Sequence, residues 1–293
     1  MTKTRTVQNI IAPPAPHMVG DGFRVHNFFP GSEDIDMVRM SPFFLLDYNS
    51  LMEWPASERP RGVGVHPHRG FETVSIAYKG SVAHHDSAGN SGIIYEGDVQ
   101  WMTAASGILH KEYHEKEYSR KGGEFQMVQL WVNLPASAKM SPPKYQAITK
   151  ELIAKSELPV DGGTVRVLAG EYKEVKGPAF TFSPINIYMI ELKKGASLSL
   201  SLNQNHNTGI LIVKGQAVFN QTEHAPTDHF VLFKNDGELI SIESMEDCHL
   251  LVLSGEPIKE PVAAYGPFVM NTREEIMQAY ADYNSGKFGV LED

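Results

Sequence analysis

Short runs of apolar and β-branched residues, each ended by a turn signal, set the hydrophobic pattern of this chain. Residues 72–78 read Glu-Thr-Val-Ser-Ile-Ala-Tyr and end at a Lys-Gly turn, and residues 125–134 alternate Phe, Met and Leu with Gln and Asn before Pro135. Turn signals recur roughly every 8–12 residues, which is the spacing of an antiparallel sandwich or barrel. The pattern therefore predicts an all-β fold.

The second half of the chain repeats this style, which predicts two related β domains. Its strand-like runs are residues 165–168, 185–192, 198–202, 210–213, 217–219 and 249–253. Similar strand–turn–strand corners occur at residues 79–82 and 214–218, about 135 positions apart, as in an internal repeat. Residues 135–145, rich in Pro, Ser, Ala and Lys, form the predicted linker. We therefore place an N-terminal domain at residues 1–140 and a C-terminal domain at residues 141–293.

One helix is expected, close to the C-terminus. Residues 272–275 read Thr-Arg-Glu-Glu, a capping box in which the Thr and the second Glu satisfy each other's backbone N–H groups. Gly286 then provides a stop signal. The apolar stripe of this helix consists of Ile276, Ala279, Tyr280 and Tyr283. The pattern predicts a short helix from about residue 273 to the glycine.

Composition and charge narrow the class of protein. Hydrophobic residues make up 42% and charged residues 21% of the 293 positions, which is enough apolar material for a sizeable core. The formal net charge of −9 argues against a nonspecific nucleic-acid binder. The start of the chain lacks the apolar core of a signal peptide, and no run approaches the ~20 apolar residues of a membrane span. The single cysteine, Cys248, excludes an internal disulfide. We expect a soluble cytoplasmic protein, or a nuclear one if the organism is eukaryotic.

Histidines are concentrated in the first half of the chain. Six of the twelve are His66, His68, His84, His85, His110 and His114. On an extended strand His66 and His68 project from one face, and so do His110 and Glu112. If these two strands are neighbours in a barrel, three imidazoles and one carboxylate converge. Such a donor set suits one divalent metal, Fe, Mn, Ni, Cu or Zn, and leaves room for substrate and O₂ on a metal that accepts six ligands.

Other interpretations of these histidines stay open. A single His-x-His strand is more often a surface or hydrogen-bonded feature than a metal site. A helical zinc-protease motif fails because Lys111, rather than Glu, follows His110. His114 shares the strand parity of His110 and is either a fifth donor or a solvent-facing strand end. His84 and His85 are predicted to lie in a polar turn as a loop feature or as contacts of the ligands.

Several sequence blocks together resemble the pirin family of the cupin superfamily. The blocks are residues 41–47, 66–74, 97–104, 107–112, 129–134, 255–258 and 266–272. The first histidine block, His-Pro-His-Arg-Gly-Phe-Glu-Thr-Val, is highly specific. The resemblance implies a monomer with two cupin, jelly-roll-like β-barrels packed face to face, with metal, Fe(II) by family expectation, only in the N-terminal one. No second site is expected in the C-terminal half, which lacks a His-x-His pair.

The resemblance also assigns the ligands and the chemistry. It places the metal on His66, His68, His110 and Glu112, whereas the general cupin pattern would offer Glu72 as the carboxylate. The implied reaction is a flavonol dioxygenase, in which quercetin and O₂ react with ring cleavage and release of carbon monoxide, and Glu112 acts as general base. The alternative is an iron-containing, redox-sensitive regulator that binds a protein partner. Candidate walls for an aromatic substrate are Phe71, Trp101, Met102, Met127 and Trp131.

Overall fold

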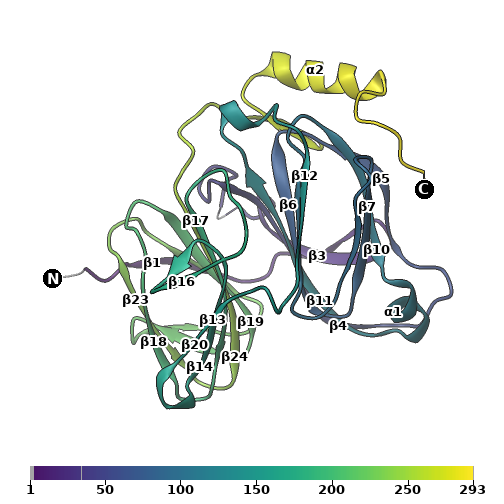
Figure 1. Cartoon of the computed structure of the whole chain (residues 1–293). Helices are drawn as coiled ribbons and strands as arrows, with labels where there is room; N and C mark the ends of the chain where they lie inside the picture. The colour runs from purple at the N-terminus through teal and green to yellow at the C-terminus, as the bar shows by residue number, and fades with distance from the viewer. Residues whose placement is uncertain (1–2, 34, 293) are drawn as a thin grey trace. The chain divides into compact units, whose positions relative to one another are not determined.

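The computed structural model describes residues 3–33 and 35–292, and these are mostly β-strand (Figure 1). The chain forms two compact units. One unit, here called the N-terminal barrel, comprises Ala15–Pro30, Phe44–Lys150 and Ile258–Asp293. The other, the C-terminal barrel, comprises Met1–Pro14, Gly31–Phe43 and Glu151–Pro257. The predicted all-β architecture with two barrels is confirmed.

The N-terminal barrel is built from two antiparallel sheets. In spatial order the larger sheet contains β12 (Lys144–Ile148), β9 (Val99–Thr103), β6 (Phe71–Lys79), β11 (Gly123–Asn133), β4 (Phe43–Trp54), β3 (Phe23–Phe29) and β2 (His17–Val19). The smaller sheet contains β5 (Gly62–His68), β10 (Ile108–His114), β7 (Val82–Asp86) and β8 (Ser91–Ile94). The remaining elements of this barrel are α1 (Lys116–Lys121), the 3₁₀ turn η1 (Ala136–Ala138), the hairpin β25 (Ala263–Tyr265) and β26 (Phe268–Met270), and α2 (Arg273–Asn284).

The C-terminal barrel has the same two-sheet construction. Its larger sheet contains β1 (Val7–Ile11), β22 (Phe230–Phe233), β19 (Asn207–Lys214), β24 (Cys248–Gly255), β17 (Ile185–Leu192), β14 (Gly163–Ala169) and β13 (Lys155–Glu157). Its smaller sheet contains β18 (Ser197–Ser201), β23 (Leu239–Ser244), β20 (Ala217–Phe219) and β21 (Glu223–Ala225). The hairpin β15 (Glu171–Tyr172) and β16 (Val175–Lys176) and the 3₁₀ turn η2 (Pro159–Asp161) complete it.

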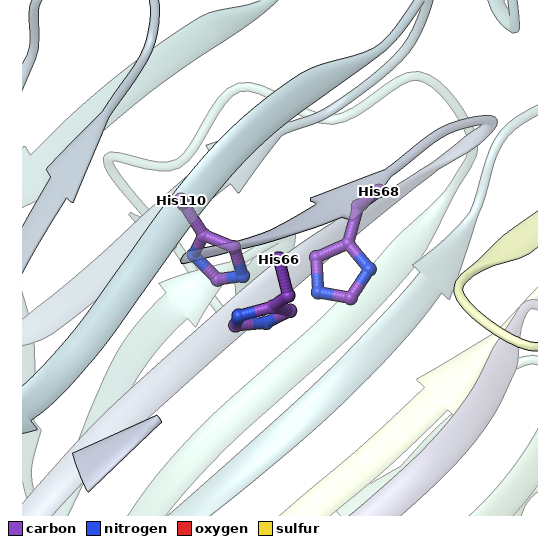
Figure 2. Close-up of side chains that lie close together, drawn as sticks. All are labelled: His66, His68 and His110. Carbon is purple, nitrogen blue, oxygen red and sulfur yellow. The ribbon is translucent and has the colours of Figure 1, made fainter. Parts of the chain in front are cut away.

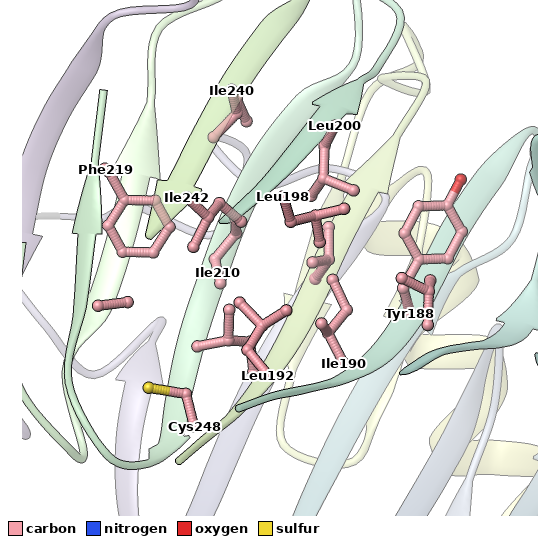
Figure 3. Packing of buried hydrophobic residues seen from close by; sticks show 14 of the residues in the cluster. Tyr188, Ile190, Leu192, Leu198, Leu200, Ile210, Phe219, Ile240, Ile242 and Cys248 are labelled. Carbon is pink, nitrogen blue, oxygen red and sulfur yellow. The ribbon is translucent and has the colours of Figure 1, made fainter. Parts of the chain in front are cut away.

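Hydrophobic side chains fill the interior of the C-terminal barrel (Figure 3). In β18 the two leucines, Leu198 and Leu200, are buried, and the serines that alternate with them are exposed. This period-two pattern is what a strand with one face in a core requires. Phe219 and Ile240 are fully buried in the same cluster. The interior of this barrel is therefore a packed apolar core.

The boundary between the units differs from the single cut predicted at residue 140. Strand β12 lies beyond that cut but pairs with β9 in the N-terminal barrel. Strand β1 pairs with β22 in the C-terminal barrel, although it opens the chain. Strands at a sheet edge leave backbone N–H and C=O groups unpaired, and a strand from a distant part of the chain can satisfy them. Local composition carries no signal for such pairing. The sequence therefore could not predict this exchange of segments, in which the start of the chain joins the C-terminal barrel and its end joins the N-terminal barrel.

The predicted C-terminal helix is confirmed as α2, drawn in yellow in Figure 1. The Thr272 hydroxyl accepts a hydrogen bond from the Glu275 backbone N–H, and the Glu275 carboxylate accepts one from the Thr272 N–H. Ile276 and Ala279 are buried, whereas Tyr283 is 38% exposed. The buried stripe is therefore narrower than predicted. Within the described residues, no helix is long and apolar enough to cross a membrane.

A second short helix, α1, was not predicted. It lies in the charged run of residues 115–124. In the structure the Glu115 carboxylate accepts hydrogen bonds from the backbone N–H groups of Glu117 and Tyr118 and so caps the first turn. This cap is local and would have been visible as an acidic residue directly before the Lys-Glu-Tyr run.

Candidate metal centre

The two histidine-bearing strands are neighbours in the N-terminal barrel. Strands β5 and β10 pair antiparallel, and their register sets His110 directly opposite His66. Along β10, Ile108, His110, Glu112 and His114 are buried, and the residues between them are partly exposed. Because alternate residues of a strand share a face, the two predicted donor pairs point into the same interior.

The three imidazoles form one tight cluster. The ring centroid of His66 lies 4.8 Å from that of His68 and 4.2 Å from that of His110. One nitrogen from each ring lies within 4.8 Å of the other two. Figure 2 shows the three rings directed toward a common point. Two metal–nitrogen bonds of about 2.1 Å span at most about 4.2 Å, so small ring rotations let all three bind one cation.

Hydrogen bonds prepare two of these rings for metal binding. His66 Nδ1 lies 2.9 Å from the Gly64 carbonyl oxygen, and His68 Nδ1 lies 3.4 Å from the Pro267 carbonyl oxygen. A carbonyl can only accept, so each Nδ1 carries the proton and each Nε2 keeps a lone pair for a metal.

The third ring, His110, provides the test of whether a metal fits. It is fully buried, and among the described residues neither of its ring nitrogens has a hydrogen-bond partner. A buried polar nitrogen without a partner costs free energy, which a metal–ligand bond would offset. The donor set of this cluster therefore fits a divalent first-row cation.

The protonation states of these rings also suit a metal. Burial, together with the charge of neighbouring histidines, lowers the pKa of His68 well below its usual value. The same two causes, burial first, lower the pKa of His110 well below its usual value. Both imidazoles are therefore neutral near pH 7, which is the form that binds metals.

Glu112 lies beside the histidines in a network of hydrogen bonds. Its Oε1 accepts hydrogen bonds from Ser75 Oγ at 3.1 Å and from Gln100 Nε2 at 3.1 Å, and its Oε2 accepts one from Gln129 Nε2 at 2.6 Å. Its carboxylate comes within 4.8 Å of ring nitrogens of both His84 and His110. The structure thus brings Glu112 next to His110, with three side-chain donors that fix the position of its carboxylate group.

His84 also belongs to this cluster, although the sequence predicted it to lie in a polar turn. It lies with His85 in strand β7 rather than in a turn, and its side chain is fully buried. Gln100 Nε2 lies 3.1 Å from His84 Nδ1, and Asp86 Oδ2 lies 3.4 Å from His84 Nε2. The prediction of a turn was wrong because the polar run begins inside a paired strand and reaches the turn only after Asp86. The interpretation of His84 as a contact of the ligands agrees with this network.

Glu72, the alternative carboxylate, points away from the cluster. It is three residues before Ser75 on β6, and the Ser75 hydroxyl bonds Glu112, so strand parity places Glu72 on the opposite face of the sheet. There its Oε1 accepts a hydrogen bond from Thr103 Oγ1 at 2.7 Å. Burial raises the pKa of Glu72 to about 7. This carboxyl group is part of the packing on that face.

His114 is neither a donor to the cluster nor exposed to solvent. Its Nε2 lies 2.8 Å from the Gly22 carbonyl oxygen, and its ring is 1% exposed. Aromatic rings surround it, those of Phe23, Trp54, Tyr118 and Phe125. Burial lowers the pKa of His114 to about 4. Both alternatives considered for His114 were therefore wrong, because an aromatic cluster closes this end of the barrel.

The five residues predicted to line a site for an aromatic substrate lie in different parts of the N-terminal barrel. Phe71 and Trp131 stack with centroids 4.2 Å apart, and both rings pack against His68. Met127 lines the interior cavity described below. Met102 belongs to another cluster with Ala104 and Ile108. Trp101 is an odd number of residues from Gln100, which bonds Glu112, so it faces the other side of β9.

A small cavity adjoins the cluster inside the N-terminal barrel. Its volume is about 30 Å³, and it is lined by Val19, Phe23, Val25, Asp47, Asn49, Val63, His66, Glu112, Met127 and Gln129. A water molecule needs roughly 10–15 Å³ by this measure, so the cavity holds one or two water-sized groups. The sequence analysis did not predict Asp47, Asn49 or Gln129, although each is a polar residue within an otherwise apolar, strand-like run.

Comparison with known proteins matches this arrangement. The family described as Pirin matches residues 22–132, and the Pirin C-terminal cupin domain matches residues 187–289. A Pseudomonas aeruginosa protein named "Putative quercetin 2,3-dioxygenase PA2418" is 47% identical over 93% of this chain and 94% of its own length. A tomato (Solanum lycopersicum) pirin-like protein is 39% identical over 87% of this chain and 84% of its own length. The crystal structure of quercetin 2,3-dioxygenase from Acinetobacter baumannii superposes with a TM-score of 0.93 and 44% identity, over 99% of this chain and 100% of that one.

Two β-barrels, one with a packed apolar core and one with a cluster of histidines able to hold a metal, define a bicupin. Within that class, the chain belongs to the pirin family, as its resemblance to that family predicted.

Proposed function

We propose that this protein is a metal-dependent dioxygenase of the pirin type that cleaves flavonols such as quercetin with O₂ and releases carbon monoxide. The single observation that carries the proposal is the convergence of three imidazoles, one of them, His110, fully buried and without a hydrogen-bond partner among the described residues. The similarity to two proteins named as quercetin 2,3-dioxygenases supports the same activity.

The proposed ligands are His66, His68, His110 and Glu112, and the proposed cofactor is one Fe(II) ion. Mn, Ni, Cu and Zn suit the same donors, and selection among these metals depends on geometry, ligand type and metal availability rather than on affinity alone. A bound divalent cation would lower the pKa of a flavonol hydroxyl and so favour the electron-rich anion that reacts with O₂.

The chain itself positions these donors. The carbonyl groups of Gly64 and Pro267 orient the rings of His66 and His68. Gln129 and Gln100 hold the carboxylate of Glu112 in place. Rigid support of this kind keeps donors in a productive geometry and typically affects metal affinity by roughly 10–100-fold.

The size of the cavity limits how a flavonol can bind. A space of about 30 Å³ admits a reacting oxygen but no aromatic ring. The apolar side of the cavity comes from Val19 of β2 and from Phe23 and Val25 of β3, at the edge of the sheet. We infer that this edge moves outward when a flavonol binds, so that the hydroxyl enters while the rings stay nearer the surface.

The proposal is tested with protein purified without metal and loaded with Fe(II). We expect it to consume quercetin and O₂ and to release carbon monoxide, measured by absorbance, an oxygen electrode and gas analysis. His66→Ala is expected to abolish all three signals, whereas His224→Ala, which changes an exposed histidine of the C-terminal barrel, is expected to retain them.

Two results would count against this function. Turnover that survives in His66→Ala would separate the reaction from the histidine cluster. If the protein is fully loaded with metal but consumes no O₂ in the presence of quercetin or other flavonols, the proposed dioxygenase activity is wrong. The regulatory alternative would then remain.

A further inference from the structure

A second polar wall faces the candidate metal ligands across the cavity. Strand β4 contributes Asp47 and Asn49, and both line the cavity together with His66 and Glu112. The two β4 residues are two positions apart on one strand, so they share its inward face. No metal ligand assignment, by family or by geometry, uses this wall.

Two acceptor atoms of this wall, Asn49 Oδ1 and Asp47 Oδ2, have no side-chain donor among the described residues. Asn49 is 2% exposed, and among the described residues its buried Oδ1 has no hydrogen-bond partner. Asp47 is 8% exposed, and within the same residues only its Oδ1 accepts a side-chain hydrogen bond, from Asn27 Nδ2 at 2.6 Å. Buried acceptors without donors are rare in folded proteins because they cost free energy. Both groups are thus available to a hydroxyl group that enters the cavity.

The general base that the resemblance to the pirin family implied, Glu112, has little free capacity to accept a further hydrogen bond. Three side chains, Ser75, Gln100 and Gln129, already donate to its two oxygens. As a metal ligand it would also give a lone pair to the cation. Both oxygens of Glu112 are therefore already engaged before a substrate hydroxyl enters the cavity.

We propose that Asp47 is the general base that removes the proton from the substrate hydroxyl, with Asn27 and Asn49 as positioning residues. The inference deepens the proposed function and rests on it. In the step, the O–H bond of the flavonol hydroxyl breaks, and an O–H bond forms at Oδ2 of Asp47. The electron pair stays on the flavonol oxygen, so no oxidant or reductant is consumed. Asn27 fixes the carboxylate, and the Asn49 carbonyl accepts a hydrogen bond from the entering hydroxyl or a water beside it.

The surroundings of Asp47 agree with this role. Burial raises the pKa of Asp47, while the Asn27 hydrogen bond and the nearby His17 act in the opposite direction. A carboxylate with a raised pKa is a stronger base than an exposed one. The groups that face the cavity from other strands are His66 on β5, Glu112 on β10 and Gln129 on β11. Since only one or two water-sized groups fit between them, a substrate oxygen that enters the cavity would lie close to Asp47.

The test compares Asp47→Asn with Glu72→Gln. Both changes replace a buried carboxyl group of raised pKa by its amide, but Glu72 lies on the opposite face of the sheet. Each protein is loaded with Fe(II), its metal content is measured, and quercetin is added without O₂. The absorption spectrum then reports whether bound quercetin is the neutral flavonol or its red-shifted anion. O₂ is admitted last, to measure kcat.

We expect Asp47→Asn to keep its metal content, to bind quercetin mainly as the neutral flavonol and to lose roughly 10²–10⁴-fold in kcat. The unaltered protein and Glu72→Gln are expected to bind the anion and to turn over at similar rates. Asp47→Glu, which restores a carboxylate, is expected to recover part of the anion signal and of kcat.

Three results would overturn the role of Asp47. They are an unchanged anion spectrum in Asp47→Asn, an equal loss in Glu72→Gln, and the absence of any quercetin binding to the unaltered protein. If the unaltered protein binds the anion but consumes no O₂, the dioxygenase proposal fails, and the spectra still decide whether Asp47 takes the proton.

Discussion

Polar residues at inward-facing strand positions hold the side chains of the candidate metal centre in the N-terminal barrel. Gln100 illustrates this, since one amide group donates to both Glu112 and His84. Its neighbours in β9 are fully buried apolar residues, Val99 and Trp101. An amide at this position costs free energy unless its hydrogen bonds are made. The contacts of Gln100 with Glu112 and His84 offset this cost and tie the amide group to the candidate metal centre.

Removal of this amide is expected to weaken metal binding. In Gln100→Leu, Glu112 Oε1 loses one of its two donors, so the carboxylate is held less firmly. We expect Fe(II) affinity to fall by roughly 10–100-fold, as measured by competition with a chromophoric chelator. Gln204→Leu, at an exposed position of the C-terminal barrel, is the matched control. Equal affinity in both variants would show that the network does not support the ligands.

Glu72 is expected to make stability depend on pH. Its pKa rises from 4.5 to about 7 in the folded protein because of burial, so the folded state holds its proton more tightly than the unfolded state. The associated stabilisation is complete below about pH 4.5 and is lost as pH rises through about 7. In Glu72→Gln this loss is absent. The free energy of unfolding is measured by urea unfolding of metal-free protein. For Glu72→Gln it should rise relative to that of the unaltered chain between pH 5 and 8, by up to about 3 kcal/mol. A constant difference across this range would contradict the assignment.

At the scale of elements, the C-terminal segment supports the strand that carries two of the histidines. The Pro267 carbonyl oxygen lies 3.4 Å from His68 Nδ1. Arg69, which follows His68 in the chain, forms a buried ion pair with Asp282 of α2 at 2.9 Å. The Arg69 guanidinium also lies 4.7 Å from the centre of the Phe288 ring. Helix α2 and the residues around it therefore act as a clamp on the end of β5.

Breaking this clamp is expected to cost both stability and metal affinity. Asp282→Ala leaves the Arg69 guanidinium buried without its carboxylate, a change that typically costs about 3–5 kcal/mol. We expect a lower midpoint of urea unfolding and a weaker Fe(II) complex. Glu274→Ala, an exposed acidic position on the same helix, should change neither. If Asp282→Ala unfolds earlier but binds Fe(II) as before, the clamp stabilises the fold without positioning His68.

The edge strands β2 and β3 are expected to respond to substrate. They supply the apolar side of a cavity that is too small for a flavonol ring. Quercetin bound without O₂ should therefore change amide hydrogen exchange in residues 17–29, since β2 has a pairing partner on one side only. Strand β24, in the core of the C-terminal barrel, serves as the internal reference. Unchanged exchange in residues 17–29 with quercetin bound would mean that the flavonol enters by another path.

At the scale of the whole molecule, the sequence predicted the parts that follow local rules. Strand alternation, the capping box at Thr272 and the same-face spacing of His66 and His68 each depend on residues close together in the chain. The neighbouring positions of β5 and β10 came from the resemblance to a family. Local patterns could not predict three features that depend on pairing between distant parts of the chain. These are the exchange of segments between the barrels, the burial of His114 and the cavity at Asp47.

The order of segments along the chain also sets when the histidine cluster becomes complete during synthesis. His66, His68 and His110 leave the ribosome early, but the carbonyl of Pro267 and the carboxylate of Asp282 follow more than 150 residues later. A nascent polypeptide that ends before these residues therefore lacks the carbonyl group that orients the ring of His68, whereas the carbonyl of Gly64 beside His66 is already present.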